Sequence, residues 1–164
     1  MFKVIVPALC LTAALAGPAC AAGKVEVTYF EPDKFSDIGF GAFDRERTLR
    51  QMTMLLEAFA TKLPDGQTLK IEVTDIDLAG EQRQGRAQNL RILRGMADWP
   101  RVKLRYTLLA GSGTVSSGEA DVYDLGYQYS AVNAIGTNLP YERRMLRKWF
   151  NQTIAPLRVS QSLP

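Results

Sequence analysis

Four stretches of the chain alternate apolar and polar residues, and this alternation predicts strands. In KVEVTYF, residues 24–30, Val25 and Val27 fall on one face, and Pro32 ends the pattern. QTLKIEVTDIDL and DWPRVKLRYTLLAG carry the next two clear strands, and SGTVSSGEADVYDL returns as the hairpin partner of the second of these. LRILRG is a candidate for an additional short edge strand.

Complementary charges predict the register of the hairpin. With a turn centred on Ser112, Arg105 lies opposite Glu119 and Lys103 lies opposite Asp121. Each cross-strand pair of opposite charges contributes about 0.2–1 kcal/mol, so such pairs set the register more than they set the stability.

Two amphipathic helices are predicted, one after the first strand and one late in the chain. The first runs from about residue 45 to 63, with Asp44 as its N-cap and Pro64-Asp65-Gly66 after its end. Its apolar stripe recurs every three or four positions, at Leu49, Met52, Leu56, Phe59 and Leu63. The second runs from about residue 140 to 152 and has Pro140 in its first turn.

The order of these elements predicts an α+β domain. Consecutive strands joined by short turns favour a mainly antiparallel sheet of about four strands, with the two amphipathic helices packed on one face. Residues 23–164 are expected to form a single domain, with a weakly specified tail over about residues 153–164.

The first 22 residues are predicted to be a secretory signal peptide. Lys3 precedes an apolar run over residues 4–16, and small residues follow it. This is the three-part layout of a signal peptide, and the run is too short to span a bilayer. We expect cleavage after Ala21 or Ala22, which makes the mature chain an exported protein.

Removal of the signal peptide limits the chemistry of the mature chain. The sequence contains no histidine, and both cysteines, Cys10 and Cys20, lie within the first 22 residues. A soluble mature chain therefore forms no disulfide, no Cys/His zinc site and no Ser-His-Asp or Cys-His nucleophile. Lipid attachment at Cys20 is the alternative, although Gly17 stands where such sites usually carry a Leu-like residue.

The charge of the chain is mild. The 20 Lys and Arg against 17 Asp and Glu give a net charge of +3, which argues against a nucleic-acid partner. Positive charge gathers in YERRMLRKWF, on one face of the last predicted helix. This basic face either binds an anionic lipid or an acidic partner or, as we favour, is simply solvated.

The eleven residues IEVTDIDLAGE, 71–81, change their pattern midway. Apolar side chains hold one parity up to Val73, and Asp75 and Asp77 then take over those positions. Either a bulge near Thr74 turns the following side chains over, or the strand runs past the edge of the core. Both arrangements place the two carboxylates on one face, about 6–7 Å apart.

Three interpretations of this acid pair compete. Two are functional: a divalent-metal site and a general acid/base pair. The third, which we favour, is that the carboxylates hold the following polar loop through arginines and backbone N–H groups. The spacing begins like a calcium loop, but Ala79 and Arg86 occupy its fifth and twelfth positions, which excludes an EF-hand. A looser site of Asp75, Asp77 and Glu81 stays open; no metal and no cofactor is predicted.

The turn DWPR, residues 98–101, adds the remaining candidate residues. Trp99 precedes a proline, which holds it extended, and is either a ligand platform or, as we favour, a residue at the rim of the core. No catalytic residue is predicted. The candidate binding set consists of Asp75, Asp77, Glu81, Asp98, Trp99 and Arg101.

Several blocks of the sequence together resemble a known family. They are VEVTYFEPDKFSDIG, LPDGQTLKIEVTDIDLAGE, DWPRVKLRYTL and LPYERRMLRKWF. They resemble the exported proteobacterial family catalogued as domain of unknown function 3016, over nearly the whole mature chain. The resemblance implies a Gram-negative periplasmic or envelope setting and no particular activity. It also draws attention to the acid pair and to the turn at residues 98–101.

The sequence thus predicts a periplasmic, non-catalytic binding or assembly module for an envelope protein or a small ligand. It would act through a sheet edge, or through the loop AGEQRQGRAQN and the adjoining turn at residues 98–101. One alternative is an enzyme that uses the carboxylates at 75, 77 and 81, with or without a divalent cation, on an envelope substrate. The other is a lipid-anchored factor at the outer membrane. No transmembrane helix is expected in the mature chain.

Overall fold

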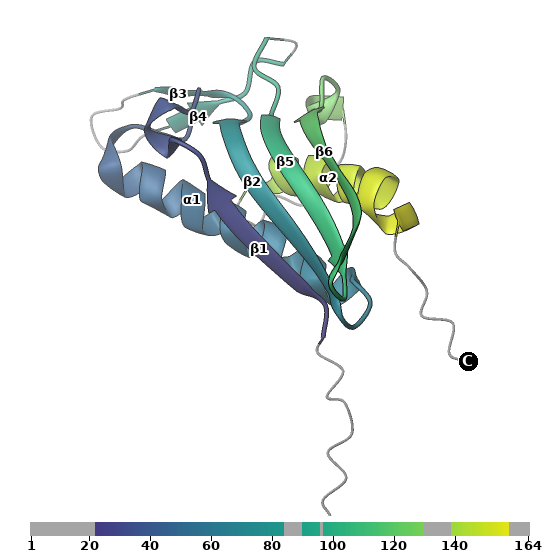
Figure 1. Cartoon of the computed structure of the whole chain (residues 1–164). Coiled ribbons are helices and arrows are strands. Elements are labelled where there is room, and N and C mark those ends of the chain that lie inside the picture. The colour runs from purple at the N-terminus through teal and green to yellow at the C-terminus, as the bar shows by residue number, and fades with distance from the viewer. Residues whose placement is uncertain (1–21, 84–89, 96, 130–138, 158–164) are drawn as a thin grey trace, which may run out of the picture.

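The computed structural model describes residues 22–83, 90–95, 97–129 and 139–157. The predicted signal peptide lies outside these residues except for Ala22, and so does most of the loop AGEQRQGRAQN. Within the described part of the chain, no helix is both long enough and apolar enough to cross a membrane. The α+β class is confirmed, with two sheets and two main helices (Figure 1).

The main sheet has four strands in the order β1-β2-β5-β6. They are β1 (Lys24–Tyr29), β2 (Gln67–Asp77), β5 (Arg101–Ala110) and β6 (Gly113–Tyr123). The β2–β5 and β5–β6 pairs are antiparallel, which confirms the mainly antiparallel sheet. β1 is parallel to β2, because the chain passes between them through a helix that returns it to the same end of the sheet.

This crossover helix is α1 (Gly41–Glu57), which a 3-10 turn over Ala58–Lys62 extends. The predicted N-cap is wrong: the helix begins before Asp44, and Phe40 occupies the cap position without a side-chain cap. Asp44 lies instead in the first helical turn, where a carboxylate favours the positive end of the helix dipole. Its Oδ2 accepts a hydrogen bond from Gln82 Nε2 at 3.2 Å.

The β5–β6 hairpin has the predicted register. Arg105 lies opposite Glu119, and Lys103 lies opposite Asp121. The first pair forms an ion pair, with Arg105 Nε 3.2 Å from Glu119 Oε1. Asp121, however, binds Arg101, which donates to Oδ1 from Nε at 2.7 Å. A diagonal neighbour on the same face of a sheet is within reach of a long arginine side chain.

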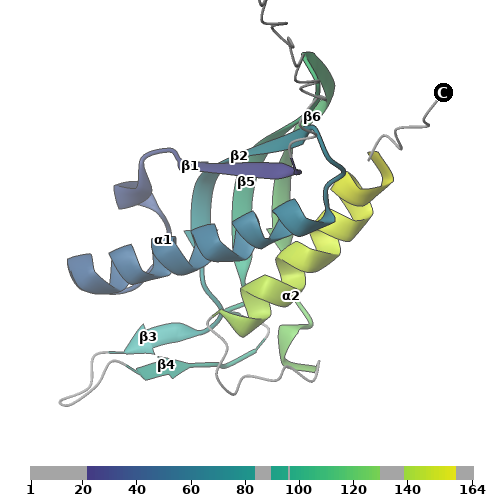
Figure 2. The ribbon, with the colours of Figure 1, turned by 90° about the horizontal axis from the view of Figure 1, so that it is seen from below.

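A second, small sheet stands at the end of the main sheet (Figure 2). It pairs β3 (Glu81–Arg83) with β4 (Leu90–Ile92) in antiparallel fashion. The run LRILRG therefore contains a strand, as the sequence suggested, but this strand does not join the main sheet. Its partner β3 is short and polar, so no alternation marked it in the sequence.

The last helix, α2 (Pro140–Trp149), begins at the proline predicted for its first turn. A π-helical turn over Phe150–Ile154 and a 3-10 turn over Ala155–Leu157 continue it. Ile154 belongs to the segment that the sequence left as a weakly specified tail, yet it is completely buried. It shares a helix face with Leu146, which is also completely buried.

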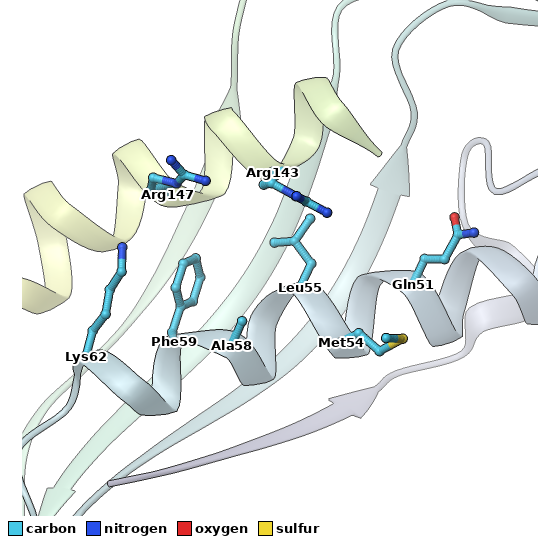
Figure 3. Close-up of a pocket in the computed structure, with 8 residues that line it drawn as sticks. All are labelled: Gln51, Met54, Leu55, Ala58, Phe59, Lys62, Arg143 and Arg147. Carbon is cyan, nitrogen blue, oxygen red and sulfur yellow. The ribbon is translucent and has the colours of Figure 1, made fainter. Parts of the chain in front are cut away.

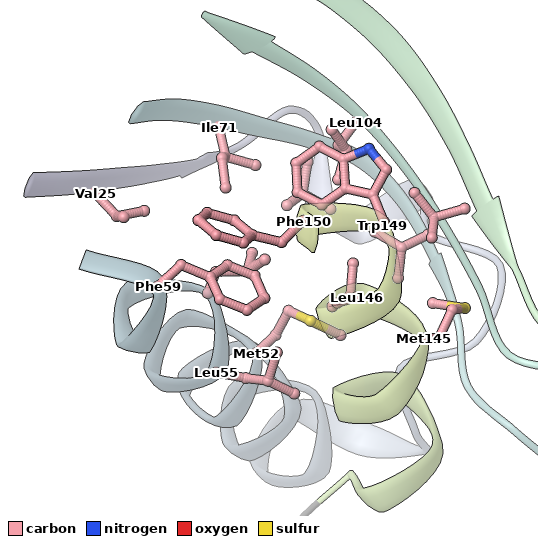
Figure 4. Packing of buried hydrophobic residues seen from close by; sticks show 14 of the residues in the cluster. Val25, Met52, Leu55, Phe59, Ile71, Leu104, Met145, Leu146, Trp149 and Phe150 are labelled. Carbon is pink, nitrogen blue, oxygen red and sulfur yellow. The ribbon is translucent and has the colours of Figure 1, made fainter. Parts of the chain in front are cut away.

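Side chains from the sheet, α1 and α2 form one hydrophobic core (Figure 4). Phe59 and Phe150 stack within it, with ring centroids 4.4 Å apart and planes 22° from parallel. Trp149 meets Tyr106 of β5 edge to face, with centroids 5.8 Å apart. In Figure 2, α1 and α2 lie next to each other against the main sheet, and residues of both helices line a groove between them.

Candidate functional site

β2 contains a bulge, which was one of the two interpretations of its change in pattern. Val73 pairs with Leu104 and Asp75 pairs with Lys103, so that Thr74 is the extra residue. The bulge turns the following side chains over, and the apolar residues beyond it reach the core on the opposite parity. The pattern IEVTDIDLAGE is therefore the sequence trace of a bulged strand.

Asp75 fastens the loop before α1 to the sheet. Its Oδ1 accepts a hydrogen bond from Ser36 N at 2.8 Å, and its Oδ2 accepts one from Ser36 Oγ at 3.0 Å. Lys103 Nζ lies 3.7 Å from the same carboxylate. Both oxygens of Asp75 thus have partners within the fold.

Asp77 pairs with the same loop through the backbone. Asp37 forms an isolated parallel bridge with it: Asp37 N donates to Ile76 O at 2.9 Å, and Leu78 N donates to Asp37 O at 3.2 Å. Burial raises the pKa of the Asp77 carboxyl, and the nearby carboxylates of Asp37 and Asp75 raise it further. The guanidinium groups of Arg91 and Arg101 oppose this rise.

Arg91 of β4 joins the small sheet to this loop. Its Nη1 and Nη2 donate to the two carboxylate oxygens of Asp37, at 2.9 and 3.2 Å. Nη1 also lies 2.6 Å from the carbonyl oxygen of Gly80, 3.2 Å from that of Ala79 and 3.4 Å from that of Leu78. One guanidinium thus binds a carboxylate and lies close to three successive carbonyl oxygens.

Glu142, in the first helical turn of α2, also binds the segment at residues 78–80. The residue is 2% exposed, and its Oε1 accepts a hydrogen bond from Ala79 N at 2.8 Å. Burial raises the pKa of Glu142, while this hydrogen bond and Arg91 lower it. Gly80 is required in the segment at residues 78–80: its φ is 79°, and a Cβ would lie 2.7 Å from the carbonyl oxygen of Ile92.

Asp98 closes the turn before β5. Its Oδ2 accepts a hydrogen bond from Arg94 N and its Oδ1 accepts one from the Tyr127 hydroxyl, both at 2.6 Å. Gly80 N donates to the backbone oxygen of Asp98 at 2.9 Å, which ties this turn to the end of β2. The Tyr127 ring is completely buried, and its pKa is raised by burial and by the bond to Asp98.

The remaining predicted residues do not converge on one ligand site. Glu81 forms an ion pair with Arg94 at 2.8 Å, and Arg101 pairs with Asp121 across β5 and β6. Trp99 is partly buried beside the turn that Asp98 holds. Among the described residues, no three acidic side chains stand close enough together to hold a metal ion.

A groove of about 500 Å³ lies elsewhere, between α1 and α2 (Figure 3). We call it the interhelical groove. Five of its lining residues are apolar or uncharged, and all five belong to α1 and its 3-10 extension. The other three lining residues are cations. The lining consists of Gln51, Met54, Leu55, Ala58, Phe59, Lys62, Arg143 and Arg147.

The cations of the interhelical groove face an apolar floor. Figure 3 shows Lys62 rising from the end of the α1 extension toward α2, which carries Arg143 and Arg147. Lys62 Nζ lies 5.8 Å from the ring centroid of Phe59 and 5.8 Å from that of Phe150. Its ammonium group thus lies near both rings of the stacked aromatic pair, at one end of the groove.

The interhelical groove is not predicted from the sequence, although the sequence does show the basic face of α2 that forms one of its walls. The basic face of α2 was noted and assigned to solvent. The α1 side was hidden, because the groove uses the flank of an apolar stripe whose centre packs in the core. Only the crossing of the two helices brings Ala58 and Arg147 to the same recess.

The comparisons with known proteins give a family and no activity. A family model described as Protein of unknown function (DUF3016) matches residues 23–152. A search of the curated proteins finds no match. Among solved structures, the hypothetical protein CT253 from Chlamydia trachomatis is 10% identical, with 84% of this chain and 96% of that chain covered and a TM-score of 0.36. A likeness at this level carries no argument about function.

Proposed function

The chain belongs to the DUF3016 family, and on this premise we propose that it is an exported, non-catalytic binding module of the bacterial envelope. Its ligand site is the interhelical groove. Export rests on the signal-like first 22 residues, and the periplasm is the compartment that they and the family resemblance favour.

The size and the chemistry of the interhelical groove support its assignment as the binding site. The interhelical groove has about 500 Å³ of space, within the range of sites that take small ligands, and combines an apolar floor with three cations. Polar groups placed around an apolar recess are what fix the orientation of a bound molecule. The proposed site is therefore a basic recess, whereas the site predicted from the sequence was centred on two acids, Asp75 and Asp77.

The engagement of the carboxylates supports a non-catalytic module. A general acid or base must reach the proton that it transfers. Asp75 instead accepts two hydrogen bonds from Ser36, and Asp98 accepts two from Arg94 and Tyr127. Glu81 is bound to Arg94 on the surface. In this arrangement these acids hold loops to strands of the fold.

Blocking the groove tests this proposal. Ala58 is exposed on the groove floor, so Ala58→Trp fills the recess without entering the core. Ala42→Trp is the matched control, since Ala42 is exposed on the same helix outside the groove. Each protein is isolated gently from periplasm, and native mass spectrometry measures any bound small molecule.

We expect a co-purifying molecule on the wild type and on Ala42→Trp, and its loss from Ala58→Trp. Equal melting temperatures of the three proteins show that the fold is intact. A bound molecule that persists on Ala58→Trp would place the site elsewhere and overturn the proposal, as would protein free of any bound molecule in all three preparations.

A further inference from the structure

The floor of the interhelical groove is a continuous stripe along α1 and its extension. Its lining residues recur every three or four positions, which places them on one helix flank. They run from Gln51 to Lys62 and so extend for about 16 Å at the rise of a helix. Met54 is 70% exposed on this stripe, and methionine adapts its shape to an apolar guest. A long, narrow apolar floor suits an extended alkyl chain better than a compact ring system.

The facing wall carries the charge. Arg143 and Arg147 are one helical turn apart on α2 and line the groove together with Lys62. None of the described lining residues is acidic. The one acid of α2, Glu142, is buried and accepts a hydrogen bond from Ala79 N.

Another acid, Glu57 at the end of α1, is not among the lining residues. Its charge contributes to the raised pKa of Tyr29, whose side chain comes from β1. The Tyr29 hydroxyl itself lies 3.0 Å from Leu49 O and 2.8 Å from Thr53 Oγ1. Neither Glu142 nor Glu57 lines the groove, whose described lining contains three cations and no acid.

The apolar floor and the cations come together at one end of the groove. In Figure 3, Lys62 lies at one end of the groove, beyond Phe59, and Arg147 lies across from Phe59 toward the same end, while Met54 and Gln51 lie toward the other end. Guanidinium and ammonium groups bind phosphate and carboxylate by charge-assisted hydrogen bonds. An anion alone would not contact the apolar floor, and an uncharged chain would not pair with the cations.

We propose that the ligand of the interhelical groove is a single-chain anionic amphiphile, with its phosphate or carboxylate head at Lys62 and Arg147 and its alkyl chain along Ala58, Leu55 and Met54. This inference rests on the proposed function and names its ligand class. A recess between two helices receives one chain, whereas contact with a whole membrane surface needs a protruding apolar face.

Titration calorimetry on the mature protein tests the ligand class. The probe is dodecyl phosphate, kept below its micelle concentration. Inorganic phosphate presents the head alone, dodecyl maltoside presents the chain with a neutral head, and vesicles of anionic phospholipid present a charged bilayer. Proteins compared are the wild type, Ala58→Trp, the double variant Lys62→Gln with Arg147→Gln, and Lys148→Gln as an exposed α2 cation outside the lining.

We expect one dodecyl phosphate per chain and binding at least about tenfold weaker in the double variant, the factor for losing a charged hydrogen bond. Lys148→Gln binds as the wild type does, Ala58→Trp does not bind, and added salt weakens the affinity. Melting curves of the free proteins exclude unfolding as the cause.

Equal binding of inorganic phosphate, equal binding of the maltoside, or binding to vesicles alone would overturn the ligand class. So would unchanged affinity in the double variant. If dodecyl phosphate does not bind while Ala58→Trp still loses a co-purified molecule, only this inference fails. If Ala58→Trp loses nothing in either experiment, the proposed function fails as well.

Discussion

Arg91 binds the carboxylate of Asp37 with both ends of its guanidinium, Nη1 at 2.9 Å from Oδ2 and Nη2 at 3.2 Å from Oδ1, across 54 positions of the chain. The same Nη1 lies 2.6 Å from the carbonyl oxygen of Gly80. This contact joins the small sheet, the loop before α1 and the end of β2. The acid-rich segment at residues 71–81 thus takes part in the contacts that hold these three parts of the fold together.

Replacement of Arg91 by lysine tests these contacts. A lysine keeps the charge but cannot reach both oxygens of Asp37 and the carbonyl of Gly80 together. We expect Arg91→Lys to lower the free energy of unfolding by about 2 kcal/mol, measured by urea denaturation. Arg50→Lys is the control, because Arg50 makes an exposed pair with Glu46 on one helix turn and should lose less than about 0.5 kcal/mol. Equal losses in both variants would contradict the role of Arg91.

Substitution of Gly80 measures how tightly the turn is enclosed. In Gly80→Ala the new Cβ would stand 2.7 Å from the carbonyl oxygen of Ile92, in a left-handed backbone conformation. We expect a loss of about 2–3 kcal/mol in the free energy of unfolding. In Gly111→Ala the φ of 58° is also left-handed, but no atom lies within 4 Å of the new Cβ, and the loss should be about 1 kcal/mol. A smaller loss at Gly80 than at Gly111 would refute the close approach.

Glu142 predicts a pH dependence of stability. Burial raises its pKa in the folded chain above the ordinary value, so the folded state holds the proton more tightly than the unfolded state does. Its contribution to stability is therefore complete below the ordinary carboxyl pKa and is lost as the pH rises through the raised value. Asp77, whose pKa burial also raises, acts in the same direction.

Glu142→Gln removes the part of this dependence that Glu142 causes. The amide oxygen of Gln can still accept the hydrogen bond from Ala79 N, while it carries no charge beside Asp37 and Arg91. We expect the difference in unfolding free energy between wild type and variant to shift in favour of the variant as the pH rises from about 4, near the usual carboxyl pKa, to about 8. Parallel pH profiles of the two proteins would show that Glu142 does not titrate differently on folding.

The double variant Asp75→Asn with Asp77→Asn separates structure from metal binding. Asn at 75 can accept only one of the two hydrogen bonds from Ser36, so we expect a loss of about 1–2 kcal/mol in the free energy of unfolding. The melting temperature of the wild type should be the same with millimolar Ca²⁺, with Mg²⁺ and with EDTA. A rise with either metal that disappears in the variant would establish a cation site instead, because a ligand that binds only the folded state stabilises it.

The intact mass of the protein recovered from the bacterial envelope tests the predicted signal peptide. We expect the intact mass to correspond to a chain that starts at Ala22 or Gly23, as the signal-peptide pattern predicts. A mass that includes Cys20 and attached acyl chains would instead establish the lipid-anchored alternative, and it would place the interhelical groove close to a membrane.

Local patterns in the sequence were enough to predict most elements and one register. Alternation marked β2, β5 and β6, and the charges of Arg105 and Glu119 set the hairpin, because strand pairing across a short turn depends on neighbouring residues. The change of parity at Asp75 indicated a bulge as one of two alternatives, and the structure has the bulge. The parallel pairing of β1, the small sheet and the N-terminus of α1 were not predicted, because each depends on contacts that the local pattern does not contain.

The sequence by itself determined the α+β class, the strands of the hairpin and the absence of histidine from the chain, because these follow from residue types and short spacings. The tertiary structure alone decided what the acidic residues do. Asp37 meets Arg91, and Glu142 meets Ala79, only because the crossing of loop, sheet and helix brings distant segments together. The interhelical groove has the same origin: its floor and its cations come from two helices far apart in the chain, and their packing angle, which no local spacing encodes, makes them one surface.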